Sequence, residues 1–177
     1  MKRTFTLLFL LTFTACVVYA QEKVNPNQPG INLSTAKGYI TINELHFGFG
    51  LVVTDVPYSK SFFGFTTIHG YQFNKSILAA AGTGLSFYNG GLFVPLFLDF
   101  RFRFNIDQYT PYVFADGGFL LNFSDFGSTK LFVNPGMGIR YAFNHNWAGN
   151  LGAGLLIQYG GVRDSFINFK TGATYKF

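Results

Sequence analysis

The residues best placed to do chemistry lie in residues 92–104, LFVPLFLDFRFRF. Asp99, Arg101 and Arg103 stand two residues apart, and apolar residues separate them. Because successive side chains of a β-strand point to opposite faces, one face carries all three charges and the other carries only apolar groups. An acid beside two bases could form an internal network of ion pairs and hydrogen bonds, or it could line a gated ion path.

The histidines give little support for catalysis. His46 lies two residues from Glu44, so an acid–base dyad is conceivable. No serine–histidine spacing supplies a nucleophile, so we favour a histidine within a polar interior network. His69 and His145 are isolated, and the only cysteine is Cys16, so no metal-ligand spacing exists. We therefore expect no catalytic site, metal or cofactor, and the protein is predicted not to be an enzyme.

The composition indicates β-structure. The 177 residues are 49% hydrophobic and 20% aromatic, with 24 Phe and 21 Gly, and only 12% are charged against about 25% in an average protein. Phenylalanine and glycine suit strands and tight turns better than helices. The apolar face of residues 92–104 is unbroken for about 13 residues, whereas a strand that crosses a bilayer needs about 9–11. A closed barrel is the only sheet that can cross lipid, which cannot satisfy an open edge.

The same alternation recurs along the chain and predicts eight strands with short connections. They span residues 38–53, 62–73, 77–87, 92–104, 112–123, 131–143, 147–159 and 166–177. In the second strand Ile68 falls out of step with its apolar neighbours, so we expect a β-bulge at an undetermined position. Residues 160–165 are expected to form a loop. The predicted fold is all-β: an eight-stranded antiparallel up-and-down transmembrane β-barrel.

The polar face of these strands would line the barrel interior. We predict a polar network that contains Glu44, His46, Asp99, Arg101, Arg103, Asp116, Arg140, Gln158, Lys170 and Lys176. Because eight strands leave an interior that side chains can fill, we interpret this network as a plug. The alternative is a narrow pore that prefers anions, because bases exceed acids. A soluble barrel that binds a ligand remains a third alternative, although its apolar outer faces would meet water.

The amino terminus reads as a signal peptide. Residues 1–20 combine Lys2 and Arg3 with an apolar run that ends before Gln21, which places cleavage between Ala20 and Gln21. Removing two of 13 bases leaves 11 against 8 acids, a net charge of about +3, too small to indicate nucleic acid. Residues 21–37 then form a disordered leader, and residues 38–177 form the barrel domain. Cys16 could alternatively be a lipidation site, although the sequence around it departs from a lipoprotein box.

These residues together resemble the small OmpX/OmpA-type outer-membrane β-barrels of Gram-negative bacteria. The resemblance covers residues 38–177, and the carboxyl-terminal Tyr175 and Phe177 look like the signal that the barrel-assembly machinery reads. The junction Ala20–Gln21 is similar to cleavage sites of the Bacteroidota. The resemblance implies an outer-membrane location with both termini periplasmic, and contact with outer-membrane lipid, with periplasmic chaperones in transit and with the assembly machinery. A structural role in envelope integrity and a surface interaction stay open as two hypotheses, and loops shorter than those of OmpX and OmpA weaken an adhesin role carried over from that family.

Overall fold

The computed structural model describes residues 37–51, 60–89, 91–104, 108–122, 129–160 and 162–177. The predicted signal peptide with its Ala20–Gln21 junction, Cys16 and the leader up to residue 36 lie outside the described residues. Most of the connections expected between the first and second, fourth and fifth, and fifth and sixth strands lie outside them as well.

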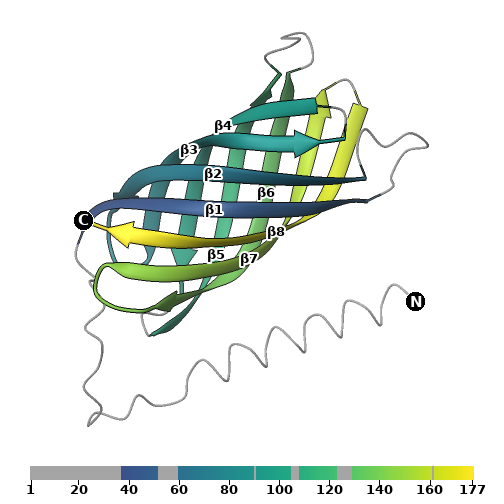
Figure 1. The fold of residues 1–177 in the computed structure, drawn as a ribbon. Coiled ribbons are helices and arrows are strands. Elements are labelled where there is room, and N and C mark those ends of the chain that lie inside the picture. Colours follow the sequence, from purple (N-terminus) through teal and green to yellow (C-terminus); the bar gives the residue numbers. More distant parts are fainter. Residues whose placement is uncertain (1–36, 52–59, 90, 105–107, 123–128, 161) are drawn as a thin grey trace, which may run out of the picture. The chain divides into compact units, whose positions relative to one another are not determined.

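Eight strands form a closed antiparallel barrel, as the alternation predicts (Figure 1). They are β1 (Gly38–Leu51), β2 (Ser61–Gln72), β3 (Ile77–Tyr88), β4 (Gly91–Arg103), β5 (Tyr109–Leu121), β6 (Lys130–Ala142), β7 (Trp147–Gly160) and β8 (Val162–Lys176). Each strand pairs with the next, and β1 closes the ring against β8. We call the end at which β1 begins and β8 ends the terminal end, and the other end the distal end. No helix among the described residues is long and apolar enough to span a membrane.

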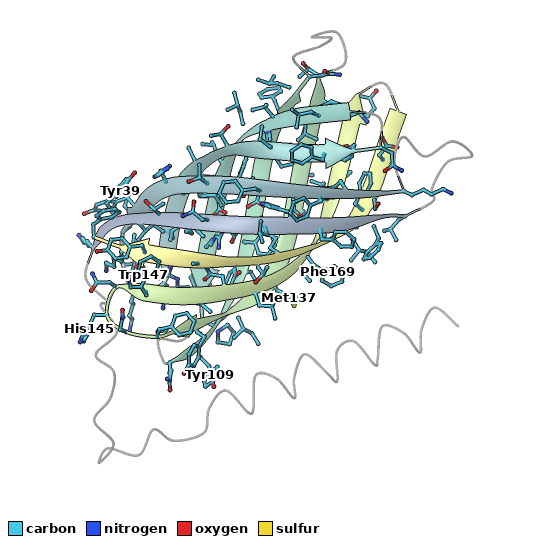
Figure 2. All side chains as sticks on the ribbon, viewed as in Figure 1. Tyr39, Tyr109, Met137, His145, Trp147 and Phe169 are labelled. Carbon is cyan, nitrogen blue, oxygen red and sulfur yellow. The ribbon has the colours of Figure 1, made fainter. Side chains whose placement is uncertain are left out.

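Apolar side chains face outward from all eight strands. In β4, Leu98 and Phe100 are 56% and 54% exposed, whereas Asp99 between them is fully buried. Figure 2 shows Met137 of β6 and Phe169 of β8 on the outside of the barrel. The strands are 12–15 residues long, which exceeds the roughly 9–11 residues that cross a bilayer. The barrel thus turns its apolar face away from its own interior.

The bulge expected in the second strand is wrong. β2 pairs residue by residue with both β1 and β3, and Ile68 faces inward with no exposure. The side chains of β2 alternate regularly without a bulge, because Ile68 belongs to the interior set and Phe65 and Tyr71 belong to the outer set. The expectation failed because it assigned every large apolar residue to the outer face.

Several strand boundaries also differ from the expectation. Residues 160–165 were expected to be a loop, but β7 continues to Gly160, β8 starts at Val162, and Gln158 pairs with Asp164. Polar residues form this end of the hairpin, beyond the belt of outward apolar side chains. A hydropathy pattern cannot distinguish such a polar strand end from a loop. β5 likewise begins at Tyr109, three residues earlier than expected.

Of the three prolines inside the described strands, Pro95 and Pro135 each interrupt one ladder without shifting the strand register. The β3–β4 ladder lacks the pairings around Pro95, and the β6–β7 ladder lacks those around Pro135. The register is the same on both sides of each gap. A proline has no N–H to donate, so each one removes a ladder hydrogen bond on one side. On the other side Pro95 still pairs with β5 and Pro135 with β5.

Candidate functional site

The barrel interior is the candidate site, and the strand register divides it into three layers. The ion-pair layer contains Glu44, Asp99, Arg101, Asp116 and Lys170. The aromatic layer lies distal to it and contains Phe62, Tyr88, Phe93, Phe97, Phe132 and Phe166. The basic mouth lies at the terminal end and contains Arg103, Arg140 and Lys176. Each layer draws residues from several strands, because every strand sends alternate side chains inward.

Arg101 is the centre of the ion-pair layer. Its Nε donates to Oδ1 of Asp99 at 2.9 Å, and its Nη2 donates to Oδ2 of Asp99 at 2.7 Å. The same Nη2 lies 2.9 Å from Oε1 of Glu44 on β1. A guanidinium presents its donors as a planar fork, so one arginine can neutralise two carboxylates from different strands. Arg101 therefore links β4 to β1 across the interior.

Lys170 of β8 completes the layer from the opposite side. Its Nζ forms an ion pair with Asp116 of β5 and lies 3.6 Å from Oε2 of Glu44. It also sits 4.5 Å from the centre of the Phe114 ring, within range of a cation–π interaction. Asn134 donates to Oδ2 of Asp116 at 2.9 Å. Three carboxylates and two cations are thus held together with almost no exposure to solvent.

All ten residues predicted for the polar interior point inward, but they do not form one network. Five make the ion-pair layer. His46 lies beside this layer, two residues from Glu44 on β1, and its Nε2 is 2.5 Å from Oγ1 of Thr66. Gln158 lies at the distal end, where it donates to the hydroxyl of Tyr88. Arg103, Arg140 and Lys176 stand apart at the basic mouth. No group of three or more His, Cys, Asp or Glu side chains within the described ranges is arranged to hold a metal ion.

The aromatic layer is what the sequence analysis missed. Phe62 stacks on Tyr88 with ring centres 5.0 Å apart, and Phe166 meets the same two rings edge-on. Phe97 contacts Phe132 at 5.9 Å between ring centres. The available signal was the inward position of Phe93 and Phe97, four residues apart in the same alternating set as Asp99. A further ion pair, Lys130–Asp164 at 2.9 Å, was also missed because Asp164 was assigned to a loop.

Glycines make room for these rings. A Cβ atom on Gly82 would overlap the ring of Phe97, and one on Gly48 would overlap the ring of Phe62. Neither glycine has an unusual backbone conformation, since Gly91 is the only residue of the described ranges recorded with a positive φ. Their role is close approach: an inward ring from one strand covers the backbone of its neighbour.

A small cavity separates the aromatic layer from the ion-pair layer. It measures about 30 Å³ and is lined on one side by Phe97, Phe132 and other apolar residues and on the other by Asp116, Asn134 and Asn168. One side-chain oxygen of each of these three polar residues has no hydrogen-bond partner among the described residues. A cavity of this size has room for only one or two water molecules, and a solute path needs far more room.

The outer surface carries aromatic residues at the terminal end. The ring of Tyr175 lies 4.8 Å from Trp147 and 4.8 Å from Phe177, and Tyr39 lies 5.4 Å from Phe177, between ring centres. Figure 2 shows Tyr39 and Trp147 at this end of the barrel. His69, whose orientation the sequence left open, faces outward here and lies 2.9 Å from the hydroxyl of Tyr39. His145 lies in an exposed turn.

Solved structures share this fold. Neisserial surface protein A aligns with 80% of this chain and 99% of its own at 14% identity and a TM-score of 0.58. Ail, the attachment invasion locus protein of Yersinia pestis, aligns with 80% of this chain and 100% of its own at 14% identity and a TM-score of 0.50. No protein-family model and no curated protein matches the chain. At these identities the likeness establishes the barrel fold, and function must be argued from the residues.

Proposed function

We propose that this protein is an integral outer-membrane β-barrel without enzymatic activity. The observation that carries the proposal is the belt of large apolar side chains that faces outward on every strand. Examples on opposite parts of the ring are Phe47 of β1, Leu98 of β4 and Leu151 of β7, each more than 40% exposed. Water would oppose so large an apolar surface, whereas a lipid bilayer matches it. Aromatic residues at the terminal end would lie at the membrane interface.

The interior supports a closed lumen. The aromatic layer fills the distal half, and the ion-pair layer crosses the middle from β1 to β4 and from β5 to β8. A solute could pass only after both the ring stack and the ion pairs had separated. We therefore propose, as the first of two candidate functions, a structural barrel whose polar lumen is plugged. The pore remains the second candidate, because inward bases exceed inward acids in the described residues and would favour anions.

The role and orientation belong to the same proposal. Both termini would be periplasmic, Tyr175 and Phe177 would serve as the assembly signal, and cleavage between Ala20 and Gln21 would be of the Bacteroidota type. Chaperones and the assembly machinery would then be transient partners. For the mature protein we propose a role in envelope integrity or in surface interaction.

Heat-modifiable gel mobility of the mature protein tests the membrane proposal. A compact barrel extracted with detergent from the outer-membrane fraction should migrate faster before boiling than after it. A protein that stays soluble without detergent and shows no mobility shift would contradict the proposal. Single-channel recording on the same preparation separates the two candidates. Stable current steps with anion preference would favour the pore, and a silent bilayer that contains folded protein would favour the plug.

A further inference from the structure

The basic mouth collects three cations in one small space. Arg103 ends β4, Arg140 lies near the end of β6, and Lys176 ends β8, so all three reach the interior at the terminal end. Arg103 and Arg140 flank β5, where they pair with Tyr112 and Thr110, two residues apart. Gln72, which accepts a hydrogen bond from Arg103, pairs with Gly38, and a Cβ atom on Gly38 would lie 3.9 Å from Nζ of Lys176. Arg103 and Lys176 are 6% and 5% exposed, while Arg140 is half-buried and gives the cluster contact with solvent.

The inward carboxylates of the described residues are engaged elsewhere. Glu44 and Asp99 form ion pairs with Arg101, and Asp116 forms one with Lys170. Asp164 pairs with Lys130 at the distal end. The hydrogen bond recorded for Arg103 in the mouth goes to a neutral amide, from Nη1 to Oε1 of Gln72 at 3.0 Å.

Arg140 provides an independent sign of a missing acceptor. Its Nε is buried and has no hydrogen-bond partner among the described residues. The residues that flank Arg140 in the two ladders, Thr110 of β5 and Asn150 of β7, are buried and polar but neutral, so neither offers an opposite charge. A buried donor without a partner, or a group of buried like charges, costs folding free energy unless an acceptor of opposite charge lies nearby. The distal end, by contrast, has both members of the Lys130–Asp164 pair.

We propose that the basic mouth binds a phosphate group. Two guanidinium groups and one ammonium group match the charge and the several acceptor oxygens of a phosphate better than they match one carboxylate. The phosphate would enter past Arg140 and lie among Arg103, Arg140 and Lys176. It could come from a free phosphate compound in the aqueous space or from a phospholipid headgroup at the rim of the barrel.

Calorimetric titration of the refolded mature protein with inorganic phosphate, in dodecyl maltoside at low chloride, tests this proposal. The wild-type protein should bind phosphate saturably. Arg140→Gln should raise the dissociation constant by about tenfold or more, which is 1.4 kcal/mol or more. Arg163→Gln, which removes an exposed arginine at the distal end, is the matched control and should leave the constant unchanged. If Arg140→Gln fails to give the compact gel band, Lys176→Gln replaces it.

Two results would overturn the proposal. One is the absence of saturable binding by wild-type protein that shows the compact, heat-modifiable band. The other is an equal dissociation constant in the mouth variant and in Arg163→Gln. The same titration in phosphatidylglycerol nanodiscs identifies the source of the phosphate. Retained affinity supports a free phosphate compound, and competition by lipid that depends on Arg140 supports a headgroup. Because the gel band reports the barrel separately, failure of phosphate binding is distinct from failure of the membrane proposal.

Discussion

The ion-pair layer and the aromatic layer fill the same barrel by different physics. Arg101 can neutralise Asp99 and Glu44 only in one geometry, because its donors are directional and its partners come from two strands. Phe62, Tyr88 and Phe166 meet through rings whose attraction is weaker and less demanding in direction. Removal of one ion-pair member leaves an uncompensated charge, whereas trimming one ring leaves only a small void.

Because their interactions differ in directionality, the two layers have different roles along the lumen. The ion-pair layer joins β1 to β4 and β5 to β8, two pairs of strands whose members are distant in sequence. The aromatic layer supplies most of the volume that keeps the distal half closed. One region therefore specifies the arrangement, and the other occupies space. Substitutions in the two layers should separate these roles, and urea unfolding of the refolded barrel in lipid vesicles measures their effects on one scale.

The largest effect is expected for Arg101→Met. The substitution keeps much of the side-chain volume but leaves Asp99 and Glu44 buried without their shared cation. Breaking a buried ion pair from one side costs about 3–5 kcal/mol of unfolding free energy. Arg163→Met, at an exposed position of β8, should cost less than about 0.5 kcal/mol. Similar losses in both variants would show that the ion-pair layer contributes no specific stability.

Gly82→Ala tests the close approach in the aromatic layer. The new methyl group would overlap the ring of Phe97, so overpacking should cost about 1–3 kcal/mol. Gly117→Ala is the matched control, because a Cβ atom there meets its nearest neighbours at an ordinary 3.8 Å. The double variant Gly82→Ala with Phe97→Leu should recover part of the loss. If Phe97→Leu does not restore unfolding free energy, Gly82 is required for its backbone conformation and not because it makes room for the ring of Phe97.

Phe166→Leu should have a smaller effect than either of these changes. Phe166 lies edge-on to Phe62 and Tyr88, and leucine can fill much of its space. We expect a cost of about 1–1.5 kcal/mol, typical of an apolar exchange of similar volume. A cost equal to that of Arg101→Met would remove the distinction between the two layers. The compact gel band serves as the check that the variant still forms a barrel.

The sequence predicts the outer face of the barrel better than its interior. Outward residues such as Leu98 and Phe100 follow one rule, apolar at every second position, so a single strand contains enough information. Interior contacts join strands that are far apart, as Glu44 and Arg101 do, and no local pattern specifies which strands meet. Only Asp99 and Arg101, two residues apart on one face, could be paired from the sequence.

Ile68 shows the limit of hydropathy most clearly. An interior that is part aromatic and part charged has inward residues as apolar as the outward ones, so phase cannot be assigned from residue type alone. The polar ends of β7 and β8 were misassigned for a related reason, since Asp164 lies inside the barrel and Arg163 outside it. Burial had to be known before these residues could be placed.

The smallest effect is expected at the boundary between the layers. Asn168 is 1% exposed, lines the small cavity beside Phe97 and Phe132, and its Oδ1 has no partner among the described residues. Asn168→Leu removes this buried oxygen and adds apolar contact with the aromatic layer, so stability should change by less than about 1 kcal/mol in either direction. Asn134→Leu provides the comparison, because it removes the donor to Asp116 and should cost about 1–3 kcal/mol. If Asn168→Leu proved as costly as Asn134→Leu, Asn168 would have to be counted with the ion-pair layer, and the boundary between the two layers would lie closer to Phe166.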